Sequence, residues 1–295
     1  MERTSIQFKT TDGLTLRGWL YHPLNKNKAM PAIAMSHGFA CIKEQSLDKF
    51  AKKFCDNGLV VLVWDNRNFG ESDGEPRQHI DVVMQRRDYR DALTYLSQQS
   101  FVDENRMGLW GFSLSGGNVL AVAAQDKRVK VVVANVPAMQ FWLERNQYML
   151  PIEINSLKHK LQKDREARFR GEPYETMKVV DPEKGQAAFW NDKRSIEFFM
   201  SADQWINKVT VASFDYTSEY DIENLIDKIS PTPLLIVAAT EDQLIPIAMQ
   251  IKAFEKAMHP KELLLLKGDH FSLFYEDEYF HQAADAALGW FKKHI

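Results

Sequence analysis

The sequence reads Leu109-Trp110-Gly111-Phe112-Ser113-Leu114-Ser115-Gly116-Gly117 where a short apolar run ends and a helix-forming stretch begins. A serine on a sharp turn between a strand and a helix exposes its hydroxyl, and such a turn needs small residues on both sides. The stretch therefore predicts that Ser113 is a nucleophile. The usual pattern is Gly-x-Ser-x-Gly, whereas this chain has Ser115 at the last position, so Ser115 stays open as an alternative nucleophile. The alternative is that this glycine-rich stretch only begins a helix and has no catalytic role.

Short apolar runs alternate with longer amphipathic segments, an order typical of a parallel sheet with crossover helices. The runs that we interpret as strands buried on both faces are Ala32–Ser36, Val60–Trp64, Met107–Trp110, Val129–Asn135, Leu234–Ala238 and Glu262–Leu266. Asp12-Gly13 indicates a hairpin between Ile6–Lys9 and Leu14–Tyr21. Helices are expected at about 43–57, 78–99, 115–125, 246–258 and 277–293. The pattern predicts an α/β protein with a mostly parallel twisted sheet and helices on both faces.

A nucleophilic serine needs a base that takes its proton and an acid that orients the base. Acidic residues follow the run Leu234–Ala238, and Lys267-Gly268-Asp269-His270-Phe271 follows the last run. Both stretches therefore lie at the carboxyl edge of the sheet, where ligands of open α/β folds bind. We predict His270 as the base and Asp242 as the acid, with Glu241 as the competing acid.

Attack by Ser113 on a carbonyl creates an oxyanion, which needs N–H donors. The backbone N–H of Leu114, the residue after the nucleophile, would be one donor. The loop Ser36-His37-Gly38-Phe39-Ala40 follows another predicted strand, and Gly38 lets the backbone turn toward the site. The N–H of Phe39 is therefore the second predicted donor. His37 is expected to order this loop, and His37 and Cys41 are predicted to lie at the substrate pocket.

Residues 138–210 interrupt the alternation of strands and helices. They are rich in large apolar side chains and have an amphipathic helical pattern at 152–169. We interpret them as a helical cap over one end of the sheet, with residues 1–137 and 211–295 forming the core of one catalytic unit. Ordinary packing helices are the alternative. Phe141 and Trp142 are predicted to line the pocket. Lys158–Arg170 carries six basic and two acidic residues, typical of a solvated helix face or of a docking surface for an acidic carrier or coenzyme phosphate.

Composition narrows the class of protein further. The 295 residues include 37 Lys and Arg against 40 Asp and Glu, a formal net charge of −3, which argues against a nucleic-acid partner. No apolar run approaches the ~18 residues of a membrane span, and the N-terminus lacks the order of a secretory signal. Cys41 and Cys55 form no disulfide framework, and the sequence has no zinc-type cluster or phosphate loop. We expect a cytoplasmic protein without metal, cofactor or membrane partner.

The chain order serine, aspartate, histidine is that of the α/β-hydrolase superfamily, which the chain resembles from about residue 5 to its end. A narrower resemblance is to the polyketide transferase and thiohydrolase-like group, which is related to the dienelactone hydrolases. The motifs that carry it are Ser36-His37-Gly38-Phe39, Asp65-Asn66-Arg67-Asn68-Phe69-Gly70, Pro76-Arg77 with Ile80-Asp81, Arg87-Asp88-Tyr89-Arg90-Asp91-Ala92, Gly111-Phe112-Ser113-Leu114-Ser115-Gly116-Gly117 and Ile229-Ser230-Pro231-Thr232-Pro233-Leu234. In that group Gly-x-Ser-x-Ser-Gly-Gly is the usual elbow, which favours Ser113. The resemblance implies an α/β-hydrolase fold, a Ser113–Asp242–His270 triad and chemistry on acyl esters or thioesters.

These observations predict a serine hydrolase that cleaves an acyl ester or thioester through an acyl-serine intermediate, with an apolar, polyketide-like acyl group. An acyltransferase would use the same residues to move the acyl group from a carrier protein or coenzyme A thioester to an alcohol or amine. A non-catalytic binding protein on the same fold and an enzyme that cleaves peptides are further alternatives. The sequence leaves the oligomeric state open.

Overall fold

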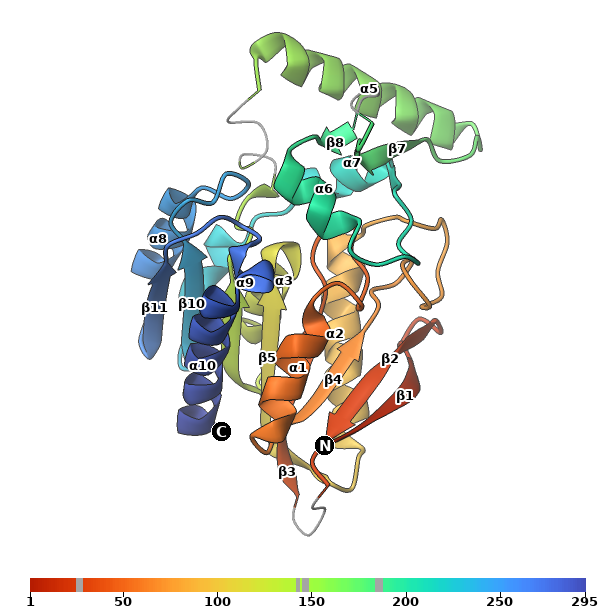
Figure 1. Cartoon of the computed structure of the whole chain (residues 1–295). Coiled ribbons are helices and arrows are strands. Elements are labelled where there is room, and N and C mark those ends of the chain that lie inside the picture. Colours follow the sequence, from red (N-terminus) through yellow and green to blue (C-terminus); the bar gives the residue numbers. More distant parts are fainter. Residues whose placement is uncertain (25–28, 142–143, 145–148, 184–187) are drawn as a thin grey trace.

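The computed structural model describes residues 1–24, 29–141, 144, 149–183 and 188–295. Its centre is an eight-stranded sheet with the strand order β1-β2-β4-β3-β5-β6-β10-β11 (Figure 1). The strands are β1 (Glu2–Lys9), β2 (Thr15–His22), β3 (Met30–Ser36), β4 (Val60–Trp64), β5 (Val102–Phe112), β6 (Val129–Asn135), β10 (Leu234–Ala239) and β11 (Lys261–Leu266). Strand β2 pairs antiparallel with β1 and β4, and the pairs from β4 to β11 are parallel. The predicted mostly parallel sheet is confirmed.

Helices cover both faces of this sheet. The larger ones are α1 (Leu47–Asp56), α2 (Val82–Ser97), α3 (Ser113–Ala123), α8 (Ile247–Lys256) and α10 (Asp277–His294), and the shorter ones are η1 (Glu223–Lys228) and α9 (Ser272–Tyr275). Helix α7 (Ala212–Ser218) instead packs on α5 (Pro151–Phe169) and β9 (Val209–Thr210), above the sheet (Figure 1). Helices α1 and α10 pack against each other on one face, and α2 and α3 pack together on the other (Figure 1). The crossover arrangement expected from the sequence is therefore present.

Two helices begin later than the sequence pattern indicates, and each has a local cause. Helix α1 begins at Leu47 rather than near residue 43, because Ser46 has a left-handed backbone with a φ of 71°. Helix α2 begins at Val82, because the Asp81 carboxylate accepts hydrogen bonds from the N–H groups of Val83 and Met84, both at 3.0 Å. Such a side-chain cap satisfies donors that the first helical turn leaves unpaired.

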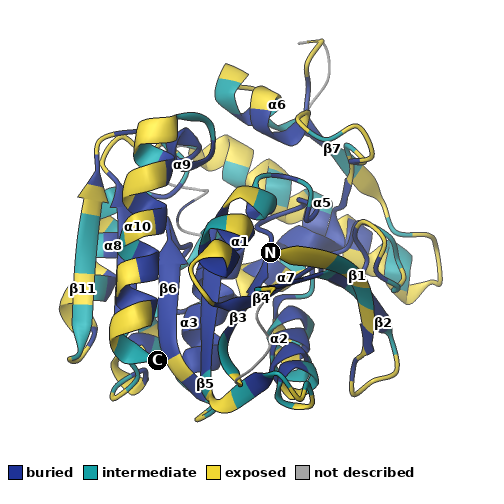
Figure 2. Cartoon of the chain, turned by 60° about the horizontal axis from the view of Figure 1, so that its bottom comes forward, coloured by how far each residue is buried: buried dark blue, intermediate teal, exposed yellow. Residues whose placement is uncertain are grey.

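The inner strands form the core of the molecule. All residues of β4 (Figure 2) and of β10 are buried, as expected for parallel strands with helices on both sides. Strand β11 differs, because it is the last strand of the sheet, and its Leu265 side chain is 49% exposed. The prediction that this run is buried on both faces is therefore wrong.

The segment between β6 and β10 lies beyond the carboxyl ends of the parallel strands, where it covers that edge of the sheet (Figure 1). It contains the helices α5 (Pro151–Phe169) and α6 (Lys193–Phe199) and a small sheet of order β8-β7-β9. These strands are β7 (Thr176–Val180), β8 (Ala188–Trp190) and β9 (Val209–Thr210). The sequence predicted helices alone, because strands of two to five residues are too short to display a two-residue period. Whether residues 138–210 act as a cap stays a prediction.

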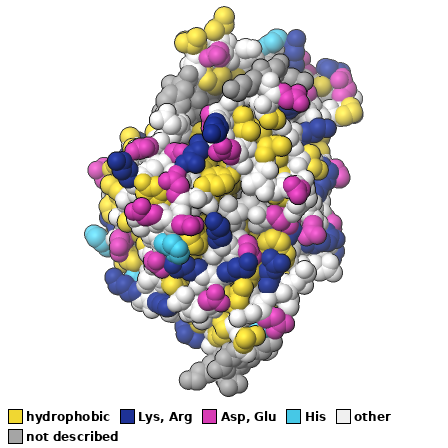
Figure 3. Space-filling view, in the orientation of Figure 1, with side chains coloured by type: hydrophobic (Ala, Val, Ile, Leu, Met, Phe, Trp, Pro, Cys, Tyr) yellow, Lys and Arg dark blue, Asp and Glu magenta, His cyan; other side chains and the backbone are white. Residues whose placement is uncertain are grey.

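Acidic and basic side chains are interspersed on the face shown in Figure 3, in keeping with the nearly balanced charge of the chain. Within the described part of the chain, no helix combines the length and the apolar character that a bilayer crossing requires.

Candidate active site

Ser113 occupies the turn between β5 and α3. Its φ of 54° lies in the left-handed region, which is strained for a residue with a side chain and is typical of functional turns. The turn is closed so tightly that a Cβ on Gly111 would lie 2.5 Å from the carbonyl oxygen of Ser115. Only glycine fits there, and the geometry agrees with the strand-turn-helix context predicted from the sequence. Ser113 lines a cavity at the carboxyl edge of the sheet.

Ser115 does not reach that cavity. Its side chain is buried, and its hydroxyl lies 2.8 Å from the carbonyl oxygen of Ser36, to which it donates. The Oγ of Ser115 also accepts the N–H of Phe112 at 3.0 Å. The hydroxyl of Ser113 is therefore the one that the structure presents to the cavity.

His270 and Asp242 meet at the same edge of the sheet. Asp242 follows β10 and His270 follows β11, and the Nδ1 atom of His270 lies 2.7 Å from Oδ2 of Asp242. The other carboxylate oxygen accepts the N–H groups of Leu244 and Ile245, both at 2.8 Å. The carboxylate is thus fixed on both oxygens, and it holds the ring with Nδ1 toward the acid. Glu241, the competing acid, is exposed.

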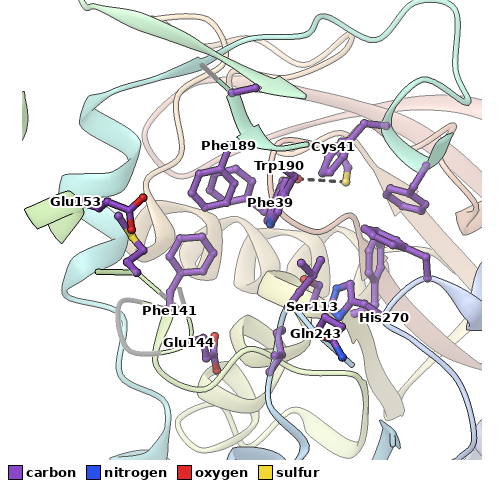
Figure 4. Close-up of a pocket in the computed structure, with 18 residues that line it drawn as sticks. Phe39, Cys41, Ser113, Phe141, Glu144, Glu153, Phe189, Trp190, Gln243 and His270 are labelled. Atoms are coloured by element: carbon purple, nitrogen blue, oxygen red, sulfur yellow. Dashed lines mark hydrogen bonds between the residues drawn. The ribbon is translucent and has the colours of Figure 1, made fainter. Parts of the chain in front are cut away.

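The side chains of Ser113 and His270 lie side by side at the floor of the cavity (Figure 4). With Nδ1 engaged by Asp242, the second ring nitrogen is the one available to a hydroxyl. The three polar side chains come from three different strand ends, brought together because parallel strands end at one edge. This arrangement can remove a proton from a serine and stabilise the resulting imidazolium.

The loop after β3 passes directly over the nucleophile turn. A Cβ on Gly38 would lie 3.0 Å from the Phe112 ring and 3.3 Å from Cβ of Ser113, so the backbone approaches closely. The next residue, Phe39, lines the cavity. The loop therefore lies next to the nucleophile turn, and the N–H of Phe39 as second oxyanion donor stays a prediction.

His37 lies behind this loop. Its Nε2 accepts the N–H of Asn66 at 2.9 Å, and its ring packs edge-on against Phe69. Burial lowers the pKa of His37 to about 4, so the ring is neutral. His37 is not among the described residues that line the cavity, because this packing turns the ring away from it. The prediction that His37 lines the pocket is therefore wrong. Its contacts with Asn66 and Phe69 agree with the expected role in ordering the loop.

Cys41 is part of the cavity wall. Its Sγ donates to the carbonyl oxygen of Phe39 at 3.2 Å, the contact drawn dashed in Figure 4. Burial raises the pKa of this thiol far above its usual range. The side chain is therefore a neutral thiol that packs, rather than a thiolate nucleophile.

The cavity has a volume of about 380 Å³ and mainly aromatic walls (Figure 4). Phe39 stacks on Phe141 and on Phe189, with ring centroids 5.2 Å apart in each pair. Phe141 lines the cavity, whereas Trp142 lies outside the described residues. The remaining aromatic residues of the wall are Phe112, Trp190, Phe198, Phe199 and Phe271. Such walls suit an apolar ligand, with a few polar groups to orient it.

Glu144 is a polar wall residue that the sequence analysis missed. Its carboxyl group is buried and accepts the N–H of Gln140 at 3.1 Å and that of Met139 at 2.5 Å. Burial, with a smaller contribution from the negative charge of Asp242, raises the pKa of Glu144 to about 7 despite these hydrogen bonds. A single glutamate in this stretch of sequence forms no motif, so only the folded chain places it at the cavity.

Arg194 of α6 is a second residue that no sequence pattern indicated. Its Nε donates to Oδ2 of Asp269 at 2.8 Å, and Nη2 also contacts Glu276. The other oxygen of Asp269 accepts the N–H groups of Phe271 and Ser272, both at 2.9 Å. The loop that carries His270 is thereby connected to the segment above the sheet. In the described residues no cluster of three or more His, Cys, Asp and Glu side chains could hold a metal ion.

Comparison with known proteins gives a consistent group of relatives. The model of the X-Pro dipeptidyl-peptidase (S15) family matches residues 12–272. The chain is 33% identical to polyketide transferase grgF of Penicillium sp. over 275 residues, covering 91% of this chain and 89% of the relative. It is 31% identical to a thiohydrolase of Eupenicillium brefeldianum over 274 residues, covering 90% of this chain and 86% of the relative.

Solved structures resemble this chain over its whole length. The α/β hydrolase GrgF from Penicillium sp. sh18 superposes with a TM-score of 0.85 at 31% identity, covering 100% of this chain and 99% of that chain. DcsB, determined in complex with its substrate analogue, superposes with a TM-score of 0.88 at 26% identity and the same coverage.

Proposed function

Because the chain belongs to the X-Pro dipeptidyl-peptidase (S15) family and to the α/β hydrolases related to polyketide transferases and thiohydrolases, we propose that it is a serine hydrolase of acyl esters or thioesters. Membership makes it an enzyme of the hydrolase type with the α/β-hydrolase fold, as the sequence predicted. The observation that carries the proposal is the 2.7 Å contact between His270 and Asp242, next to Ser113, at the floor of an aromatic cavity.

The proposed reaction uses Ser113 as the nucleophile. Nε2 of His270 takes the proton of the Ser113 hydroxyl as Oγ attacks the acyl carbonyl, and Asp242 stabilises the imidazolium. The backbone N–H groups of Leu114 and Phe39 stabilise the oxyanion. His270 then gives its proton to the leaving alcohol or thiol, which leaves an acyl-serine. Water, activated by His270, releases the acid and restores the hydroxyl.

An apolar acyl group is the proposed substrate part that enters the cavity. Rings from the core, such as Phe39, and rings from the segment above it, such as Phe141 and Phe189, form one continuous wall. The volume of about 380 Å³ is within the range of small-molecule sites. Because both parts of the chain contribute to the wall, we assign residues 138–210 the role of a cap over the site.

Acyl transfer is the second candidate function. Relatives of this chain are named polyketide transferases, and an aromatic cover over the serine would exclude water and favour another acceptor. The two reactions share the acyl-serine and differ in the nucleophile that releases it. Product analysis with and without an alcohol or amine distinguishes them, because acid as the only product at saturating acceptor excludes transfer.

A carrier or coenzyme thioester is a proposed acyl donor, but Lys158–Arg170 gives it little support. Arg165 and Arg168 both pair with Asp215, and Arg170 pairs with Glu172. Lys160 also lies 3.0 Å from Glu175. The positive charge of this stretch is therefore largely compensated by acidic neighbours, as expected for a solvated helix face.

Labelling with a fluorophosphonate probe tests the proposed function. We expect one adduct by intact mass, located on Ser113 by peptide mapping, because the probe reports an activated serine next to oxyanion donors. The adduct should be absent in Ser113→Ala and formed at least about 100-fold more slowly in His270→Ala, whose base is missing. Ester hydrolysis that persists in Ser113→Ala, or an adduct on another residue, would refute the assignment.

A further inference from the structure

We propose that Ser115, at the position where the usual elbow pattern has glycine, is a positioning residue. It keeps the two oxyanion donors at a fixed separation. This inference rests on the proposed function, because it concerns the donors of that reaction. One donor is the N–H of Leu114 on the nucleophile turn, and the other is the N–H of Phe39 on the loop after β3. The two belong to segments far apart in the chain, so some contact has to fix their separation.

The Ser115 hydroxyl provides a direct connection between these segments. It accepts the N–H of Phe112, the residue before the nucleophile, at 3.0 Å. It donates to the carbonyl oxygen of Ser36 at 2.8 Å, and Ser36 is the last residue of β3. Ser115 is only 1% exposed and Ser36 is fully buried, so water cannot replace either bond.

Ser36 is held on its other side as well. Its N–H donates to the hydroxyl of Tyr89 on α2 at 3.1 Å. Tyr89 is completely buried. Both peptide groups of Ser36 are therefore fixed by one small network, formed by Ser115 and Tyr89.

The chain beyond Ser36 has little freedom before it reaches Phe39. Only His37 and Gly38 intervene, and His37 is fixed by Asn66. Gly38 lies so close to the turn that an added Cβ would be 3.3 Å from Cβ of Ser113. A shift of the Ser36 carbonyl group would therefore also displace the N–H of Phe39, the second donor. Glycine at position 115 would leave Phe112 N–H and the Ser36 carbonyl without this shared partner.

Removal of the Ser115 hydroxyl should impair the transition state more than substrate binding. In Ser115→Ala we expect kcat on p-nitrophenyl butyrate to fall about tenfold or more, with KM within about twofold, since ~1 Å of misplacement can cost ~100-fold. The inhibition constant of a trifluoromethyl ketone, which forms an oxyanion on the serine, should rise in proportion to the loss of kcat/KM. Tyr89→Phe should change both quantities in the same direction, which keeps the test valid if Ser115→Ala folds poorly.

Ser213→Ala is the matched control. Ser213 is as deeply buried as Ser115, and its hydroxyl also accepts a backbone N–H, that of Ile80 at 2.9 Å, but it does not line the cavity. We expect this variant to keep kcat and the inhibition constant even where its melting temperature falls. Unchanged kcat in both Ser115→Ala and Tyr89→Phe, or equal losses in Ser213→Ala, would overturn the inference. If Ser113→Ala is inactive at the same time, the proposed function stands and only the role of Ser115 fails.

Discussion

At the scale of single residues, the second glycine after the nucleophile turn is explained by Tyr220. A Cβ on Gly117 would overlap the Tyr220 hydroxyl, which donates to the carbonyl oxygen of Leu114 at 2.9 Å. The peptide group that carries the Leu114 N–H is held separately, because Ala138 N–H donates to the Ser113 carbonyl at 3.0 Å. The backbone on both sides of the proposed donor is thus fixed, and Gly117 makes room for one of the two contacts.

The buried carboxyl of Glu144 should make the stability of the protein depend on pH. Burial raises its pKa to about 7 in the folded protein, against 4.5 for an ordinary glutamate. The folded state therefore binds the Glu144 proton more tightly than the unfolded state does. The resulting contribution to the free energy of unfolding is fully present below pH 4.5 and is lost as the pH rises through 7. Glu144→Gln should gain stability relative to the wild type over this range, by at most ~3 kcal/mol.

Thermal unfolding of both proteins from about pH 4.5 to about pH 8.5 measures this difference. Glu153→Gln is the matched control, because Glu153 lines the same cavity but is exposed. A melting-temperature difference between Glu144→Gln and the wild type that is the same at every pH contradicts the prediction.

At the scale of secondary-structure elements, α6 is attached to the loop of His270 by charge and by ring packing. Arg194 at one end of α6 bonds Asp269, and Phe198 at the other end stacks on Phe271 with ring centroids 4.7 Å apart. The ion pairs of Arg194 are partly exposed, so they contribute only ~1 kcal/mol or less each to stability. Their effect should therefore be local.

Arg194→Ala is predicted to loosen α6 without unfolding the protein. We expect amide hydrogen exchange in residues 193–199 to accelerate several-fold, while the melting temperature falls by only a few degrees. Lys193→Ala is the control, because Lys193 begins the same helix but its side chain is 88% exposed and lies 3.6 Å from Glu197. Equal exchange rates in the two variants would show that the contact to Asp269 does not hold the helix.

Elements differ in how far the sequence could predict them. Val60–Trp64 and Val129–Asn135 have the bounds that were predicted, because a turn or a polar residue lies within two residues of each end of these runs. The approach of Ser113, Asp242 and His270 could also be predicted, since loops after parallel strands share one edge of the sheet. In contrast, 75 residues separate Arg194 from Asp269. A pair at such a distance leaves no periodicity or motif in the sequence, and the same holds for Tyr220 and Leu114.

At the scale of the whole molecule, the cavity lies where the segment over the sheet meets the core. Trp205 donates its Nε1–H to the carbonyl oxygen of Ala40 at 2.7 Å, and Gln45 donates to that of Phe199 at 2.8 Å. These bonds join the overlying segment to the loop that follows β3. The same loop supplies Phe39, whose ring stacks on Phe189 from the overlying segment. The aromatic wall of the cavity therefore depends on the contacts between the overlying segment and the core.

Phe189→Ala should alter selectivity for the acyl group, because the ring belongs to the wall and not to the reacting groups. The variant removes apolar surface that a long chain contacts and an acetyl group does not reach. At ~25 cal/mol per Å², the loss of ~40–60 Å² of contact corresponds to roughly a five- to tenfold decrease. We expect that decrease in kcat/KM for p-nitrophenyl decanoate, with the value for the acetate within about twofold of the wild type. Met200→Ala, an exposed residue outside the wall, should change neither. Equal losses on both esters in Phe189→Ala would mean that the ring supports the catalytic residues rather than the acyl chain.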